Sequence, residues 1–274
     1  MQIQPLEPVW PQRLATIDSQ VVDIQFPRKV QVDQDAEWCE VHYADDREPQ
    51  RVRFHDYHEI YNVPGFYEAL FYGKLKCSSP LRVVSMLDEI MSERGEDLSD
   101  ARVLDVGAGN GMVGDELAVR RAEKIVGIDI IEEARDAQRR DRPEVYDSYH
   151  VADLTDLPET IEGRLRRDSF NCLTTVAALG FGDIPPAAFL KALDVTDTPA
   201  WLAFNVKEEL MRDEDESGFS GLIQKLIRRH LIEVEGYRRY SHRLSMAGKP
   251  LYYVAMIARK LEDVPDDLME RYIA

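Results

Sequence analysis

The stretch VLDVGAGNGMVG, residues 103–114, decides the fold of this chain. It begins with apolar residues that are typical of a buried strand and then becomes rich in glycine. A glycine-rich loop between a strand and a helix lets the backbone approach a bound cofactor closely. The loop fits D-x-G-x-G-x-G from Asp105 and also G-x-G-x-x-G from Gly109. Both S-adenosylmethionine and NAD(P) are therefore candidate ligands.

Two acidic residues favour S-adenosylmethionine. Asp105 ends an otherwise apolar strand, where a charge costs free energy unless it has a partner. A dinucleotide site keeps this strand apolar, whereas S-adenosylmethionine carries an ammonium group that an acid can hold directly or through water. Asp153 ends a later strand and would lie beside the adenine amino group. The structural alternatives are that Asp105 bonds the loop amides and that Asp153 caps the following turn.

Asp129 and the glycines fit either cofactor. Asp129 follows the next strand, where a carboxylate can bond both ribose hydroxyls, and an exposed strand end offers it no obvious protein partner. Gly107, Gly109 and Gly111 allow positive φ and close approach of the backbone. Gly114 falls inside the next helix, where it allows close packing against the sheet.

The apolar pattern predicts an α/β fold with a doubly wound, mostly parallel, seven-stranded sheet. The expected strands are 101–107, 124–130, 148–153, 170–179, 200–206, 231–242 and 250–260. Helices are expected over 111–122, 132–141, 185–194 and 219–230. The link 243–248 is too short for a crossover, so the last two strands form an antiparallel hairpin and the final strand is reversed.

The first part of the chain reads differently. Residues 1–60 predict a small β-rich unit with strands over 21–26, 29–32, 37–43 and 51–54. Residues 61–274 then form the main domain and begin with covering helices over 64–75 and 79–95. Ser79 is the expected N-cap of the second helix, with Pro80 at its first position.

Composition limits the function classes. The chain has 274 residues and a net charge of −17, which disfavours nucleic acid and anionic membranes as partners. The short basic runs 139–142 and 228–230 are interpreted as solvated helix faces. Three scattered cysteines without metal-ligand spacing indicate a reduced, cytoplasmic protein with no metal site. The N-terminus lacks the features of a signal peptide, and no apolar run is long enough for a membrane span.

Residues 80–260 resemble the class I S-adenosylmethionine-dependent methyltransferases, because VLDVGAGNG, GIDI, ADL and LGFGDIPP stand in the order of that family's motifs. ALGFGDIPPAAF is also similar to a Williams–Beuren-region type branch of the family. The resemblance implies cofactor contacts at Asp105, Gly107, Gly109, Gly111, Asp129, Ile130, Asp153, Leu154, Val176 and Ala177. Tyr72 and Lys76 are further candidates, for the methionine carboxylate.

The acceptor is harder to predict. TVAALGFGD, residues 175–183, stands where amino-methylating enzymes of the family have an Asn/Asp-Pro-Pro-Tyr motif. It is apolar and offers no side-chain acceptor for an amine, which favours a small molecule with an oxygen, sulfur or carbon nucleophile. The candidate general bases are His55, His58 and His242, although each is equally consistent with an exposed histidine without a role. Aromatic residues over 61–72 could line a pocket, form a lid or fill the core. The alternative function is a catalytically silent S-adenosylmethionine-binding module with a protein partner.

Overall fold

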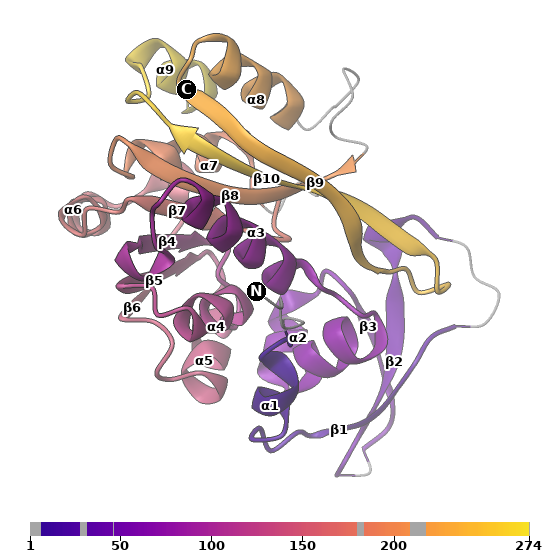
Figure 1. The fold of residues 1–274 in the computed structure, drawn as a ribbon. Coiled ribbons are helices and arrows are strands. Elements are labelled where there is room, and N and C mark those ends of the chain that lie inside the picture. The colour runs from indigo at the N-terminus through magenta and orange to yellow at the C-terminus, as the bar shows by residue number, and fades with distance from the viewer. Residues whose placement is uncertain (1–6, 28–31, 46, 180–183, 209–217, 274) are drawn as a thin grey trace.

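A seven-stranded sheet forms the centre of the molecule (Figure 1). The computed structural model describes residues 7–27, 32–45, 47–179, 184–208 and 218–273. The strands are β4 (Arg102–Val106), β5 (Lys124–Asp129), β6 (Ser148–Val151), β7 (Cys172–Thr175), β8 (Ala200–Lys207), β9 (Ile232–Leu244) and β10 (Pro250–Lys260). Their order is β6-β5-β4-β7-β8-β10-β9, and β10 runs antiparallel to both of its neighbours. The predicted fold class and the reversed final strand are confirmed.

The strands are apolar on both faces because helices cover both sides of the sheet. Val103 of β4 packs in a cluster with helix α3 (Ser79–Glu93), whereas the next residue, Leu104, packs in a second cluster with α7 (Pro186–Asp194). Asp105 points to the same face as Val103, since side chains alternate along a strand. Both it and Asn205 of β8 therefore belong to the α3 side of the sheet.

The remaining helices of the main domain follow the predicted alternation with additions. They are α4 (Met112–Val119), α5 (Glu132–Asp141), α6 (Glu159–Arg167), α8 (Phe219–Arg228) and α9 (Asp266–Ile273), with short 3₁₀ turns η3 (Leu98–Asp100) and η4 (Leu154–Asp156). Helices α6 and α9 were not predicted, because charged residues dominate both segments. None of the described helices is long and apolar enough to cross a membrane.

The N-terminal part forms a second, three-stranded antiparallel sheet. Its elements are α1 (Trp10–Leu14), β1 (Val21–Gln25), η1 (Gln34–Ala36), β2 (Trp38–Tyr43), β3 (Gln50–Arg53) and α2 (Tyr57–Asn62). The first predicted covering helix appears as the π-helix η2 (Glu68–Lys74). Of the predicted strand 29–32, residues 29–31 lie outside the described residues, and Val32 belongs to no strand.

The terminal hairpin holds this N-terminal sheet in place. Met246, in the turn between β9 and β10, joins the apolar cluster that contains Val41 and Leu70. The buried carboxylate of Glu37 pairs with the buried guanidinium of Arg243 at 2.7 Å and also accepts the Met246 N–H at 2.6 Å. The N-terminal sheet and the terminal hairpin are therefore packed together.

The prediction for the start of α3 was wrong by one residue. Ser78 is the N-cap, and Ser79 is the first residue inside the helix. The Ser79 hydroxyl is buried and bonds to β9 residues instead of capping the helix.

Candidate cofactor site

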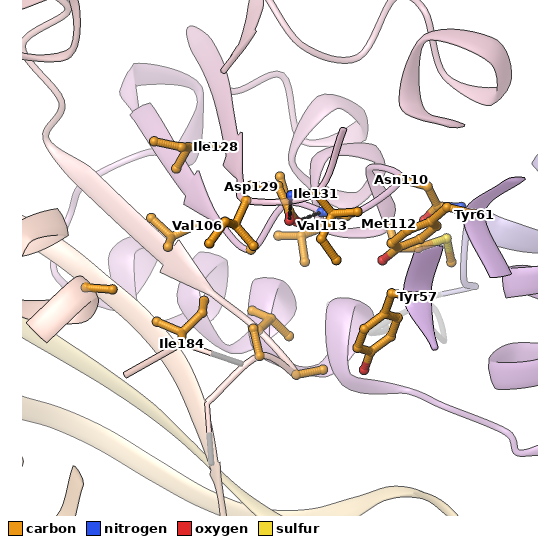
Figure 2. A pocket seen from close by; sticks show the side chains of 18 of the residues that line it. Tyr57, Tyr61, Val106, Asn110, Met112, Val113, Ile128, Asp129, Ile131 and Ile184 are labelled. Carbon is orange, nitrogen blue, oxygen red and sulfur yellow. Dashed lines mark hydrogen bonds between the residues drawn. The ribbon is translucent and has the colours of Figure 1, made fainter. Parts of the chain in front are cut away.

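A cavity of about 180 Å³ lies at the carboxyl ends of β4, β5 and β7 (Figure 2). From β4 the chain adds β5 and β6 on one side, and it then returns to add β7 on the other side of β4. Ligands of open α/β sheets bind where the strand order reverses in this way. The predicted cofactor residues that the structure brings to its wall are Tyr72, Gly107, Gly109, Asp129, Ile130, Asp153, Leu154, Val176 and Ala177. Asp105, Gly111 and Lys76 do not line it.

The glycines of the loop are required by close contacts. Gly107 and Gly109 have φ of 68° and 54°, which disfavours any other residue. A Cβ atom on Gly107 would lie 2.9 Å from the Ala178 and Ile184 side chains, and one on Gly109 would lie 2.6 Å from the Tyr61 hydroxyl. The backbone at Gly107 and Gly109 therefore packs closer to these side chains than a residue with a Cβ atom would allow.

The next two glycines of the motif serve packing. Gly111 has φ of 95°, and a Cβ there would lie 3.0 Å from Arg142 and 3.1 Å from Tyr146. A Cβ on Gly114 would lie 2.6 Å from Val145. Gly114 thus allows helix α4 to pack closely against the segment that leads into β6, whereas the sequence predicted a close contact with the sheet.

Asp129 accepts hydrogen bonds from two backbone groups, one in the glycine-rich loop and one just after β5. Its carboxylate accepts the Gly109 N–H at 2.8 Å and the Ile131 N–H at 3.1 Å. These bonds join the glycine-rich loop to the end of β5, so the expectation that this carboxylate has no protein partner was wrong. Asp129 also lines the cavity.

Asp105 lies behind the loop. Its side chain is buried and accepts hydrogen bonds from the Tyr146 hydroxyl at 2.7 Å and the Thr174 hydroxyl at 2.6 Å. Burial raises the pKa of Asp105 to about 6, although the two hydrogen bonds act in the opposite direction. The partners are the hydroxyls of Tyr146, which precedes β6, and of Thr174 in β7 instead of loop amides, and the role of Asp105 toward the ammonium group stays a prediction.

Asp153 lines the cavity beside Leu154. One of its oxygens accepts the backbone N–H and the hydroxyl of Thr155, each at 2.7 Å, and so caps η4. The capping role was the structural alternative for this residue, and it still leaves the second oxygen at the cavity wall. Ile130, 59% exposed, and Leu154 provide apolar surface there.

Four tyrosines cover the cavity from the N-terminal side. Tyr57 and Tyr61 come from α2, Tyr67 from the N-cap of η2, and Tyr72 from η2 itself. Their rings pack in pairs, with Tyr61 and Tyr67 centroids 5.2 Å apart. Burial raises the pKa of Tyr61, Tyr67 and Tyr72 above its usual range, so these hydroxyls stay protonated. Phe66 and Phe71 of the same segment are buried core residues instead.

The wall at the end of β7 is fixed by Asn205. Ala177 has a positive φ of 61°, and its N–H donates to the Asn205 Oδ1 at 2.7 Å. Asn205 is fully buried, and its Nδ2 donates to the Tyr240 hydroxyl at 2.7 Å. The Tyr240 hydroxyl lies 2.6 Å from Ser79 Oγ, which lies 2.6 Å from His242 Nδ1. A chain of hydrogen bonds thus runs from the cavity wall into the interior.

His242 ends that chain and is not an exposed histidine of the hairpin loop, contrary to expectation. It lies on β9, is 6% exposed and stacks on Tyr253 with centroids 4.1 Å apart. Burial lowers the pKa of His242 to about 3. The neutral ring shares a hydrogen bond at Nδ1 with the Ser79 hydroxyl, and it does not line the cavity.

The other candidate bases also lie away from the cavity wall. His58 is exposed and pairs with Glu133 at 2.9 Å. His55 packs its ring against Tyr57 with centroids 5.8 Å apart. Lys76 is exposed and has a positive φ of 57°. None of the three contributes to the lining of the cavity.

Sequence reasoning missed Arg142 and its partners. The run 139–142 was interpreted as a solvated helix face, but the Arg142 side chain is fully buried. It pairs with Glu68 at 2.7 Å and with Asp115 at 2.6 Å, and it donates to the Asn110 carbonyl oxygen at 3.3 Å. Nothing in the local sequence distinguishes this arginine from its exposed neighbours, because both acidic partners come from distant segments.

Comparison with known proteins finds one family match within the chain. A family model of the methyltransferase domain matches residues 104–203, which include the glycine-rich loop, Asp129, Asp153 and the end of β7. No curated protein sequence matches the chain.

Solved structures with a similar fold include three methyltransferases. An S-adenosylmethionine-dependent methyltransferase from Mesorhizobium loti is 16% identical, with 65% of this chain and 100% of that chain covered and a TM-score of 0.44. A SAM-dependent methyltransferase from Aquifex aeolicus is 20% identical, with 66% and 98% covered and a TM-score of 0.42. A ribosomal protein L11 methylase from Lactobacillus delbrueckii subsp. bulgaricus is 13% identical, with 65% and 77% covered and a TM-score of 0.43. These similarities carry no information about the acceptor.

Proposed function

We propose that this chain, which matches the methyltransferase domain family over residues 104–203 and has a reversed final strand, is a class I S-adenosylmethionine-dependent methyltransferase. We propose further that its acceptor is a small, uncharged and largely apolar molecule. The methyl group would go to an oxygen, sulfur or carbon nucleophile. The acceptor enters from the side of the four tyrosines, which present apolar ring faces and protonated hydroxyls.

The charge of the cavity wall carries this proposal. Among the described residues that line the cavity, the only charged ones are Asp129 and Asp153, and none is a lysine, arginine or histidine. An anionic acceptor would therefore meet like charge without a partner, which costs free energy in a partly buried site. The remaining wall is apolar, with Val106, Val113 and Ile184 among its residues.

The residues present fit the cofactor. Gly107 and Gly109 present backbone without side chains at the cavity wall, and Asp129 lines the cavity beside them. When bound, S-adenosylmethionine supplies an electrophilic methyl group on a sulfonium. The protein's part is to orient the two reactants, which can account for a large share of the rate of such a transfer. Val176 and Ala177 would form the wall beside the sulfonium.

We also propose that different parts of the chain have different roles. Residues 1–60 form the β-rich extension and 61–274 the methyltransferase domain. Residues 55–76, which cross this boundary, fold over the cofactor. The tyrosine contacts with the glycine-rich loop support this role. A cytoplasmic location is supported by the free cysteines, and the acidic composition supports a small molecule over nucleic acid as the acceptor.

Transfer of a radiolabelled methyl group to paired acceptors tests the proposal. Each pair would share one aromatic or aliphatic scaffold that carries the nucleophile, with and without an added carboxylate. We expect kcat/KM to be at least about tenfold higher for the uncharged member, which corresponds to about 1.4 kcal/mol. Asp129→Ala, which removes a proposed cofactor contact, serves as the control for contaminating activity. Label found only in RNA or protein, or a preference for the carboxylated members, would contradict the proposal.

A further inference from the structure

The tyrosine cover of the cavity, residues 55–76, contains a π-helix that brings two rings to one face. Tyr67 is the N-cap of η2 and Tyr72 lies five residues later; both line the cavity, with ring centroids 6.0 Å apart. In an α-helix, residues five apart point about 140° apart around the axis. The hydrogen bonds of a π-helix join residues five apart and place them nearly above one another. The position of both rings therefore depends on how the start of η2 is held.

Glu68 holds the start of η2 against the glycine-rich loop. It is the first residue of η2, directly after Tyr67, and its side chain is buried. Its Oε1 accepts one hydrogen bond from Asn110 Nδ2 at 2.8 Å and another from Arg142 Nη1 at 2.7 Å. Because Asn110 belongs to the loop, a single carboxylate oxygen joins the cover to the loop.

Arg142 holds this carboxylate with the planar fork of its guanidinium. Its Nε donates to Asp115 of α4 at 2.6 Å, and its Nη1 also donates to the Asn110 carbonyl oxygen at 3.3 Å. Arg142 is the C-cap of α5, the helix that follows Asp129 at the end of β5. One buried side chain therefore connects η2, the loop and α4 to a helix whose other end lies at the cavity.

The pair of Glu68 and Arg142 is better explained by the arrangement that it fixes than by stability. Neither residue belongs to the lining of the cavity in the part of the chain that the structure describes. Replacing a buried ion pair by apolar residues of similar volume is often neutral or stabilising. The best-attested use of such a pair is to specify one arrangement of the surrounding elements over others.

We propose that Glu68 and Arg142 are positioning residues, which fix the cover on the glycine-rich loop and thereby place Tyr67 and Tyr72 in the cavity wall. They act on the cofactor through these tyrosines and the loop, without touching it. The inference rests on the proposed function in that the cavity binds S-adenosylmethionine, and it holds for any acceptor.

Two double variants separate positioning from stability. Glu68→Met with Arg142→Met removes both charges and keeps unbranched side chains of similar length. Glu37→Met with Arg243→Met makes the same change at a buried pair that also holds the N-terminal part of the chain. Neither residue of this second pair lines the cavity, so it serves as the matched control.

The two changes remove comparable interactions. The first leaves Asn110 Nδ2 without its acceptor, and the second does the same to the Met246 N–H. Asp115 keeps a cationic partner in the first variant, because Arg13 Nε donates to it at 2.9 Å. No buried carboxylate of the network is therefore left without a positive charge beside it.

We expect calorimetry to show that S-adenosylhomocysteine binds about tenfold more weakly to the first variant, within the usual range for coupling between two parts of a protein. Its affinity for the control variant should equal that of the parent. Limited proteolysis of the empty proteins should show faster cleavage within residues 55–76 in the first variant only. A folded protein that is merely less stable keeps its Kd, so a purely structural role predicts the parent's affinity for both variants.

Arg142→Lys replaces the first double variant if that variant does not fold. Lysine keeps the charge but lacks the fork that bonds Glu68 and Asp115 together, so the same two changes are expected in smaller size. Parental affinity with parental cleavage, or equal weakening in the control variant, would overturn the proposal. If the parent itself binds no S-adenosylhomocysteine, the proposed function fails, and cleavage of the empty proteins still decides whether the pair positions the cover.

Discussion

Replacing Asn205 by leucine should damage the cofactor site without touching the cofactor. Asn205 accepts the Ala177 N–H and donates to the Tyr240 hydroxyl from a fully buried position. Leucine has a similar volume but can make neither bond. The Ala177 peptide would then lose the bond that holds its positive φ of 61°, a conformation that costs about 1–2 kcal/mol for a residue with a Cβ.

Both stability and cofactor affinity should fall. A buried N–H without an acceptor costs about 1–3 kcal/mol, and we expect the free energy of unfolding of Asn205→Leu to drop by about that amount. Because the wall at Ala177 would relax into or away from the cavity, we expect S-adenosylhomocysteine to bind about tenfold more weakly, or about 1.4 kcal/mol. Urea unfolding without ligand measures the first quantity, and calorimetry measures the second.

Asn171→Leu is the matched control for this prediction. Asn171 also accepts a backbone N–H, that of Arg102 at 2.8 Å, and donates to a backbone carbonyl. It directly precedes β7 and so lies at the amino ends of the strands, away from the cavity. This variant should lose stability and keep its cofactor affinity. If Asn205→Leu loses stability but binds S-adenosylhomocysteine as tightly as the parent, Asn205 is structural and does not position the cavity wall.

Three further predictions concern cofactor binding, pH and the cover. Asp129→Ala should weaken S-adenosylhomocysteine about tenfold to a few hundredfold in calorimetry; it should also destabilise the empty protein, because two backbone N–H groups lose their acceptor. The lowered pKa of His242, about 3, means that its contribution to stability is complete above its usual pKa of about 6.5 and is lost as the pH falls toward 3. The raised pKa of Asp105, about 6, has the opposite effect, since its contribution is complete below about 3.8 and is lost as the pH rises to 6. Urea unfolding between pH 4 and 8 measures how the free energy of unfolding changes with pH. His242→Asn and Asp105→Asn should each remove the part of this pH dependence that comes from the replaced residue, up to about 1.4 kcal/mol per pH unit. A variant with the same pH dependence as the parent would refute the assignment. Residues 55–76 should become resistant to proteolysis when S-adenosylhomocysteine binds, and unchanged cleavage would leave the tyrosines as core residues.

The alternation of strands and helices could be predicted because it follows from the local spacing of apolar residues. Strands covered on both faces are continuous apolar runs, as in 101–107, and each run is followed by a segment with helical spacing. The glycines of the loop were equally predictable, since Gly107 and Gly109 occupy backbone conformations that other residues avoid. Asp129 and Asp153 were found because each ends a strand on the side where parallel sheets bind ligands.

The buried polar groups could not be predicted because their environment is made by distant segments. Arg142 reads like its exposed neighbours until Glu68 and Asp115 are brought to it, from positions 74 and 27 residues away. His242 reads like a residue beside an exposed turn until Ser79 and Tyr253 are packed against it. Asn110 lay inside the recognised motif, and only the contact with Glu68 separates it from a spacer between glycines.

The contact between Glu37 and Arg243 has a consequence for how the protein is made. The N-terminal sheet leaves the ribosome first, but its buried carboxylate receives its partners only when the last hairpin has emerged. At about 5–20 residues per second, synthesis of the intervening chain takes on the order of ten seconds or more. During that interval the sheet exposes an unpaired charge and an incomplete apolar cluster to the cell. A nascent chain stalled before residue 243 should therefore be more prone to aggregation and to chaperone capture than the finished protein.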